Sequence, residues 1–194
     1  MDNYHHGDLR RALLDGGLEL LARKGPAGFS LRALAQELGV SHAAPYRHFA
    51  SREELLAAIV AESRERFAAA LGKSVSGPGE ASEKIYLLGE AYVRFYLANP
   101  AILYLFHVLP GQLAAEGEKL RATFHEKDED EGFGLLRSLS AQLAPLFPGL
   151  DERDVLLGFW AKAHGLATLL AAMPGYFGDE GLEAGVRRVI REAF

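Results

Sequence analysis

The chain has 194 residues, of which 49% are hydrophobic and 24% charged, and its formal net charge is −5. A chain of this length and composition can bury a core of its own, which excludes a disordered or fibrous protein. The charge is uneven. Residues 1–74 hold 10 Lys and Arg against 9 Asp and Glu, whereas the rest of the chain holds 11 against 17. The first third is therefore where a polyanion would bind.

The sequence contains no cysteine, which excludes disulfides, thiolate metal sites and cysteine nucleophiles. The opening residues MDNYHHGDLRR lack the apolar core of a signal peptide. No uninterrupted apolar stretch approaches the roughly 18 residues that span a bilayer. We therefore expect a cytoplasmic protein without a membrane partner.

Hydrophobic periodicity predicts helices almost throughout the chain. The first helix carries leucines at 14, 18 and 21 and ends at Gly25-Pro26. Ser30 stands at the N-cap position of a short second helix that ends at Gly39. A third short helix is predicted from Ser41 to about His48.

A longer helix follows, because Ser51-Arg52-Glu53-Glu54 has the pattern of a capping box. Its buried side is expected to carry Leu55, Leu56, Ile59 and Phe67. Residues 72–82, GKSVSGPGEAS, form the most linker-like stretch and the predicted domain boundary.

Beyond this boundary, five further helices are predicted over residues 85–98, 101–109, 133–147, 151–173 and about 179–193. A polar helix or loop lies before the third of these and contains the acidic run 126–131, which is expected to be solvated. No alternating strand pattern and no internal repeat is present. The predicted fold is all-α with about nine helices.

The segment that points to function is residues 30–52, SLRALAQELGVSHAAPYRHFASR. Two short helices meet at Gly39, and the small Ala35 lets them cross closely. This is helix-turn-helix geometry, in which the second helix enters the major groove of DNA. If Ser30 and Ser41 are N-caps, the N-termini of both helices offer backbone N–H groups and positive dipole ends to DNA phosphates. An ordinary helical hairpin with a glycine turn is the alternative.

Polar and cationic side chains gather in this window. Tyr46 and His48 place polar tips on the second helix, and Arg32 and Arg52 add cations on either side of it. With Arg47, the window holds three arginines against one acidic residue, which favours contact with a polyanion.

The stretch GVSHAAPYRHFASREELL resembles the signature of TetR-type bacterial transcription regulators, and the resemblance covers roughly residues 8–70. It implies DNA-backbone contacts by Tyr46, His48 and Arg52 and base-edge positions for His42, Ala43 and Ala44. It also implies that Phe49 packs in the core with Leu34, Leu38 and Val40.

Two positions depart from the family pattern. Arg52 stands where the family usually has lysine, which keeps the charge. Pro45 falls inside the recognition helix, where it removes a backbone hydrogen bond. Either the first turn of that helix is loosened, or the helix begins at Pro45.

The resemblance implies a DNA-binding domain over residues 1–52, a connecting helix to about residue 72, and an effector-binding and dimerisation domain over residues 73–194. Trp160, His164 and Gly165 resemble a subset of the family with a Trp-x-x-x-His-Gly pattern. Trp160 and His164 share one helix face, so they either form a buried pair or contact a ligand.

Aromatic residues at 92, 95, 96, 104 and 106, with a histidine at 107, either pack in the core or line a pocket. The candidate ligand-binding residues are Phe95, Tyr104, Phe106, His107, Trp160 and His164. Because these side chains are mainly apolar, we expect a small apolar or weakly polar effector.

The resemblance also implies a homodimer that pairs through the last two long helices, with small residues Ala161, Gly165, Ala167 and Ala171 at their contact. No metal-ligand spacing, cofactor motif or catalytic constellation is present, so we expect no cofactor and no enzyme activity. The predicted function is a ligand-responsive repressor that binds a palindromic double-stranded DNA operator. The alternative is a helical small-molecule binding protein or enzyme that no longer binds DNA.

Overall fold

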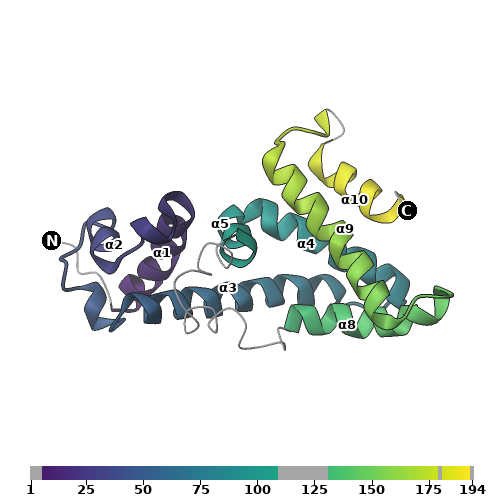
Figure 1. Ribbon diagram of the computed structural model, residues 1–194, viewed down its shortest axis with the longest axis horizontal. Coiled ribbons are helices and arrows are strands. Elements are labelled where there is room, and N and C mark those ends of the chain that lie inside the picture. The colour runs from purple at the N-terminus through teal and green to yellow at the C-terminus, as the bar shows by residue number, and fades with distance from the viewer. Residues whose placement is uncertain (1–5, 109–130, 179–180, 193–194) are drawn as a thin grey trace. The chain divides into compact units, whose positions relative to one another are not determined.

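The computed structural model describes residues 6–108, 131–178 and 181–192. Those ranges contain eight α-helices, three short 3-10 or π segments and no strand (Figure 1). The all-α prediction is confirmed, and the expected number of helices is close to the number found.

The described residues fall into two compact units. Unit 1 comprises residues 6–65 and 101–108, and unit 2 comprises residues 66–100, 131–178 and 181–192. A segment that follows residue 100 therefore packs with the N-terminal helices, which no boundary drawn along the sequence anticipates. The assignment of separate functions to residues 1–72 and 73–194 stays a prediction.

In unit 1, α1 (His6–Gly28) changes direction at Gly25, whose φ of 66° lies in the left-handed region. Only glycine adopts this conformation without strain, and the following Pro26 cannot continue the hydrogen-bond ladder. The regular helix therefore ends where the sequence predicted. Leu13 and Leu20 on its inner face have no exposed surface.

Helix α2 (Leu31–Glu37) begins as predicted, because the hydroxyl of Ser30 accepts a hydrogen bond from the amide of Ala33 at 3.1 Å. Gly39, with a φ of 66°, follows the end of this helix. Helix α3 (Arg52–Val75) begins with the hydroxyl of Ser51 accepting from the amide of Glu54 at 3.1 Å. The carboxylate of Glu54 accepts in turn from the amide of Ala50.

The third helix does not begin at Ser41 and is not an α-helix, whereas the alternative start at Pro45 matches the structure. The regular element there is η1 (Pro45–Arg47), a 3-10 turn preceded by Ala44, which makes no side-chain cap. Ser41 contributes its carbonyl to a turn, accepting from the amide of Ala44 at 2.9 Å, and does not cap this element. Proline has no N–H to donate and its fixed φ suits a first helical position, so the element begins at Pro45.

Unit 1 also contains α5 (Pro100–Leu103) from residue 101 onward and the π segment η2 (Tyr104–Val108), which lies against α1. The rest of the predicted helix over 101–109 lies outside the described residues. So does the acidic run over 126–131, apart from Glu131 at the start of α8.

Unit 2 contains α4 (Ala81–Ala98), α8 (Glu131–Leu143), η4 (Ala144–Leu146), α9 (Glu152–Ala172) and α10 (Leu182–Glu192). Helix α4 lies against α8, α9 and α10, and α9 also lies against α8 (Figure 1). The start of α9 is fixed by Asp151, whose carboxylate accepts from the amides of Arg153 and Asp154.

A buried carboxylate joins α10 to α4. Glu90 is only 2% exposed, and its oxygens accept from Arg191 at 2.8 Å and from Arg94 at 3.1 Å. Arg191 also makes a two-pronged contact with Glu83 at 2.7 and 2.9 Å. These charge-assisted bonds fix the C-terminal helix against the core helix of the unit.

Candidate functional site

The second element of the helix-turn-helix presents its side chains to solvent. Ser41, His42, Ala43, Tyr46 and Arg47 are exposed, with Tyr46 at 56%. Ala44 is half-buried. The five exposed residues therefore form a surface that can meet another molecule, whereas Pro45 in the same stretch is buried.

This surface has a buried foundation. Pro45 and Phe49 point into unit 1, and Phe49 is 2% exposed. The guanidinium carbon of Arg10 lies 5.4 Å from the centroid of the Phe49 ring, within cation–π range. Because Phe49 is buried and contacts Arg10 of α1, the exposed residues that precede it are attached to a packed base.

The predicted cations differ in their environments. Arg32, in the first turn of α2, is exposed. Arg52 is half-buried, and its Nη2 donates to the carbonyl oxygen of Pro26 at 3.0 Å. Its guanidinium carbon also lies 6.0 Å from the centroid of the Phe29 ring. The structure therefore directs Arg52 toward the interior of unit 1, whereas Arg32 faces solvent.

Two further predicted residues are partly engaged in the fold. Ser30 is half-buried and its hydroxyl caps α2. His48 is half-buried at the end of η1, and its amide donates to the carbonyl of Pro45 at 2.9 Å.

Arg47 was missing from the predicted site. It is exposed beside Tyr46, and its side chain makes no ion pair with the described residues. The signal that identifies it was the excess of arginine over acidic residues within residues 30–52.

In unit 2, a tyrosine links the two residues of the Trp-x-x-x-His-Gly pattern. The indole Nε1 of Trp160 donates to the hydroxyl oxygen of Tyr92 at 3.4 Å, and that oxygen lies 3.1 Å from Nδ1 of His164. An indole N–H can only donate, so the tyrosine oxygen accepts there, and its own proton is then available to Nδ1 of His164. In that arrangement His164 is neutral and carries its proton on Nε2.

The surroundings of these three residues, which we call the Tyr92 cluster, favour uncharged forms. Burial raises the pKa of the Tyr92 hydroxyl to about 12. Burial also lowers the pKa of His164 from its ordinary value. Phe67 packs edge-on against Tyr92 at 5.6 Å and against Phe95 at 5.2 Å. Both Trp160 and His164 stay half-buried, so part of each ring is accessible.

The six candidate ligand-binding residues divide between the two units. Phe95, Trp160 and His164 belong to unit 2, and Tyr104, Phe106 and His107 belong to unit 1. Tyr104 lies beside the bend in α1, since its hydroxyl is 3.7 Å from the point that a Cβ on Gly25 would occupy. Tyr92, which sequence reasoning placed only in the aromatic block, is the residue that brings Trp160 and His164 together.

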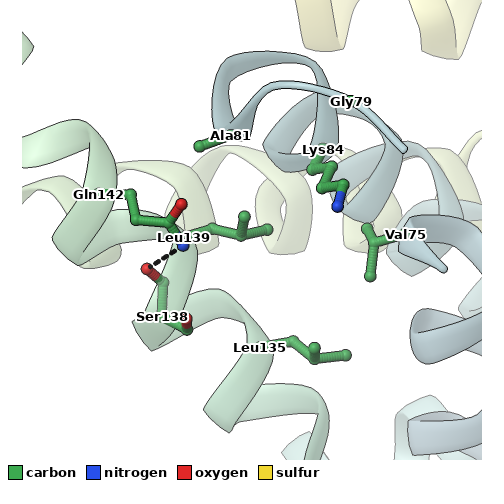
Figure 2. Close-up of a pocket in the computed structure, with 8 residues that line it drawn as sticks. All are labelled: Val75, Gly79, Ala81, Lys84, Leu135, Ser138, Leu139 and Gln142. Atoms are coloured by element: carbon green, nitrogen blue, oxygen red, sulfur yellow. Dashed lines mark hydrogen bonds between the residues drawn. The ribbon is translucent and has the colours of Figure 1, made fainter. Parts of the chain in front are cut away.

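Unit 2 also contains a hollow of about 220 Å³, which Figure 2 shows between α8 and the start of α4. Its apolar wall includes Val75, Leu135 and Leu139, and its polar wall includes Lys84 and Gln142. None of the candidate ligand-binding residues lines it. The ammonium of Lys84 makes this hollow suited to a small molecule with an anionic group.

The described part of the chain contains no group of three or more His, Asp or Glu side chains placed to bind a metal ion.

Comparison with known proteins identifies the family. The model described as "Bacterial regulatory proteins, tetR family" matches residues 13–59, which run from α1 into α3. An uncharacterised HTH-type transcriptional regulator of Mycobacterium tuberculosis is 26% identical over 157 residues, covering 73% of this chain and 77% of that protein. The chain belongs to the TetR family of bacterial regulatory proteins. It is a helix-turn-helix transcriptional regulator, and residues 41–47 lie within the segment that matches the family model.

Two solved structures extend the likeness over the whole TetR-family chain. A protein of unknown function from Rhodococcus sp. RHA1 is 33% identical, covers 100% of this chain and 96% of its own, and has a TM-score of 0.71. The regulator FadR from Bacillus subtilis, solved with stearoyl-CoA, has a TM-score of 0.73 at 16% identity, covering 95% and 98%. The second likeness concerns the fold alone. Membership of the Trp-x-x-x-His-Gly subset stays a prediction.

Proposed function

We propose that this TetR-family regulator is a ligand-responsive repressor that binds a palindromic operator as a homodimer. The observation that carries the proposal is the exposure of Ser41, His42, Ala43, Tyr46 and Arg47 beside the buried Pro45 and Phe49, inside the part of the chain that matches the family. Such a regulator acts on DNA in the bacterial cytoplasm, and no catalytic role is proposed.

The proposed DNA contacts follow from side-chain chemistry. Tyr46, Arg47 and Arg32 are exposed donors suited to phosphate oxygens. His42 is the exposed polar side chain before η1 and is the candidate for reading base edges, while Ala43 and Ala44 can only touch a thymine methyl. Ser30 and Ser41 add hydroxyl donors near the DNA backbone, whereas Nε2 of His48 is buried and leaves Nδ1 as its candidate contact.

The proposed dimer interface lies on α9 and α10. Leu157 and Leu169 on α9 are each 57% exposed, and a Cβ added at Gly158 or Gly165 would meet no atom within 4 Å. Ala161 and Ala171 are exposed as well. Ala167 differs, since it has no exposed surface within the protomer and cannot take part in the contact.

By length and composition, helix α9 is apolar enough to cross a membrane, and 22% of its most apolar stretch of 18 residues is buried. Lys162 interrupts its apolar run and donates to the carbonyl of Ile190 at 2.8 Å. We propose that the exposed leucines of α9 pack against a second subunit, because regulators that bind two-fold symmetric DNA sites are dimers.

For the effector, we propose a small apolar or weakly polar molecule that contacts the accessible edges of Trp160 and His164 in unit 2. The fold likeness to FadR, which was solved with stearoyl-CoA, supports an effector-binding role. The hollow beside Lys84 differs from this place, because the Lys84 ammonium would supply a counter-charge to an anionic ligand.

Selection from a random duplex library, followed by fluorescence anisotropy on the selected site, tests the DNA part of the proposal. We expect an inverted repeat, and we expect His42→Ala to change the preferred bases. If no duplex is selected above background, the chain is instead a helical binding protein that has lost DNA binding. A thermal-shift screen with matched fatty alcohols and carboxylates, read out by DNA release, tests the effector class and separates the two places in unit 2.

A further inference from the structure

Arg52 is the first residue of α3, and its side chain turns back toward the junction of α1 and α2. Its Nη2 donates to the carbonyl of Pro26 at 3.0 Å, and its Nε atom is buried. Its guanidinium carbon lies 6.0 Å from the centre of the Phe29 ring. One side chain thus contacts two residues of the segment 25–29, which connects α1 to α2.

That segment determines where α2 begins. It starts at the left-handed Gly25, and the carbonyl of Pro26 also accepts from the amide of Phe29 at 3.2 Å. Phe29 is 2% exposed and directly precedes Ser30, the N-cap of α2. A change in this segment would therefore shift the start of α2 and the surface of residues 41–47 that follows it.

We infer that Arg52 is a positioning residue, which ties the segment 25–29 to the start of α3 and makes no net contribution to phosphate neutralisation. A charge-assisted hydrogen bond and a cation–π contact are both strong enough to hold one loop conformation. The phosphate contacts then fall to Arg47 and Arg32, which are exposed and make no ion pair with the described residues. Arg52 thus has a structural role at a position where the family resemblance implies a contact with the DNA backbone.

Salt dependence separates the two roles. Each phosphate that a cation neutralises contributes about 0.9 to the slope of log K against log salt concentration. A residue that only positions the reading surface lowers affinity equally at every salt concentration and leaves that slope unchanged.

The experiment compares Arg52→Met with Arg47→Met, since both remove a guanidinium and keep a long side chain. We expect Arg52→Met to bind the selected operator about tenfold more weakly at each salt concentration, a loss of ~1.4 kcal/mol, with the wild-type slope. We expect Arg47→Met to lower the slope by about 0.9. A slope lowered by about 0.9 in Arg52→Met overturns the inference, and an unchanged slope in Arg47→Met overturns the assignment to Arg47.

A second readout does not depend on DNA. Hydrogen exchange at the amide of Phe29 should accelerate in Arg52→Met and stay unchanged in Arg47→Met, and equal exchange in both variants contradicts the positioning role. This readout remains valid if the wild-type chain binds no duplex, which would refute only the proposed function.

The unaltered protein provides a third test in case Arg52→Met fails to fold. Phenylglyoxal should modify Arg47 quickly in the free protein and slowly with operator bound, whereas Arg52 should react slowly in both states. Rapid modification of Arg52 that operator DNA blocks would show that it faces the phosphates.

Discussion

The hydroxyl oxygen of Tyr92 lies 3.1 Å from Nδ1 of His164, so a residue of α4 and a residue of α9 share a hydrogen bond inside unit 2. The same oxygen accepts from the indole of Trp160. Tyr92 therefore connects the tryptophan and the histidine of the Trp-x-x-x-His-Gly pattern, although it lies 68 residues before Trp160. Such a network fixes the orientations of its side chains and adds to stability, because each hydrogen bond restricts the rotamer of the next side chain.

The Tyr92→Phe variant tests the energetic role of this hydroxyl. It removes the acceptor for Trp160 and the donor to His164, so we expect the free energy of unfolding to fall by about 1–3 kcal/mol. Urea denaturation measures the loss. Tyr86→Phe is the matched control on the same helix, and its hydroxyl makes no hydrogen bond with the described residues. An equal effect of the two variants would show that the Tyr92 hydrogen bonds contribute nothing particular.

Stability should depend on pH through His164. Burial lowers its folded-state pKa below the unfolded value of 6.5, so the unfolded chain binds more protons in the interval between them. The free energy of unfolding should therefore increase as pH rises through that interval to about 6.5, and the contribution should be constant above it. Tyr92, with its pKa near 12, stays neutral throughout.

Urea denaturation between pH 5 and 7.5 checks this pH dependence, with His164→Asn expected to flatten the curve. In addition, ¹⁵N chemical shifts at neutral pH should show the Nε2-protonated tautomer. A histidine protonated on Nδ1 would contradict the hydrogen-bond order in the Tyr92 cluster.

The bend in α1 requires glycine at position 25. Gly25→Ala places a Cβ on a residue with φ of 66°, so we expect a loss of about 1–2 kcal/mol. Gly72→Ala is the opposite control, because Gly72 lies inside α3 with no atom within 4 Å of an added Cβ. That variant should gain about 0.5–1 kcal/mol. Thermal unfolding of the two variants should therefore shift in opposite directions.

Glu90 should be among the most sensitive charged positions. In Glu90→Gln, the buried partner of Arg94 and Arg191 loses its charge, and we expect a destabilisation of about 1.5–3 kcal/mol. The control is Glu183→Gln, because Glu183 is exposed and 3.8 Å from Arg94. Its effect should stay within about 1 kcal/mol. Chemical denaturation of both variants measures the difference, and a small effect of Glu90→Gln would show that α10 is held by its apolar face.

The proposed dimer depends on the exposed leucines of α9. Leu157→Glu and Leu169→Glu each place a charge on that face, and we expect the protein to become monomeric in multi-angle light scattering at micromolar concentration. Glu152→Gln, at the exposed start of α9, should leave the mass unchanged. A monomeric wild-type protein would refute the assembly.

Local chemistry made the helix boundaries of unit 1 predictable. Gly25-Pro26 and the hydroxyls of Ser30 and Ser51 act within three or four residues of the chain, so their roles are readable in sequence. The effect of Pro45 was visible only as two alternatives, because its neighbours decide whether a turn loosens or a helix starts late.

The candidate site was predictable only where it is local. Helical spacing paired Trp160 with His164, but nothing in the sequence pattern selects Tyr92 as their shared partner. The direction of the Arg52 side chain likewise depends on the path of residues 25–29, which comes from another part of unit 1. Contacts across long sequence separations follow from packing, which a single sequence does not display.

In the proposed DNA-bound dimer, the brevity of η1 would limit how much DNA sequence one subunit recognises. A single 3-10 turn of three residues, with His42 and Ala43 ahead of it, offers very few side chains to base edges. Each good base contact provides only about 1–3 kcal/mol of discrimination. Operators of this regulator should therefore have few invariant bases in each half-site and depend on the distance between half-sites and the deformability of the DNA between them. Most of the information that selects a promoter would then reside in spacing and shape.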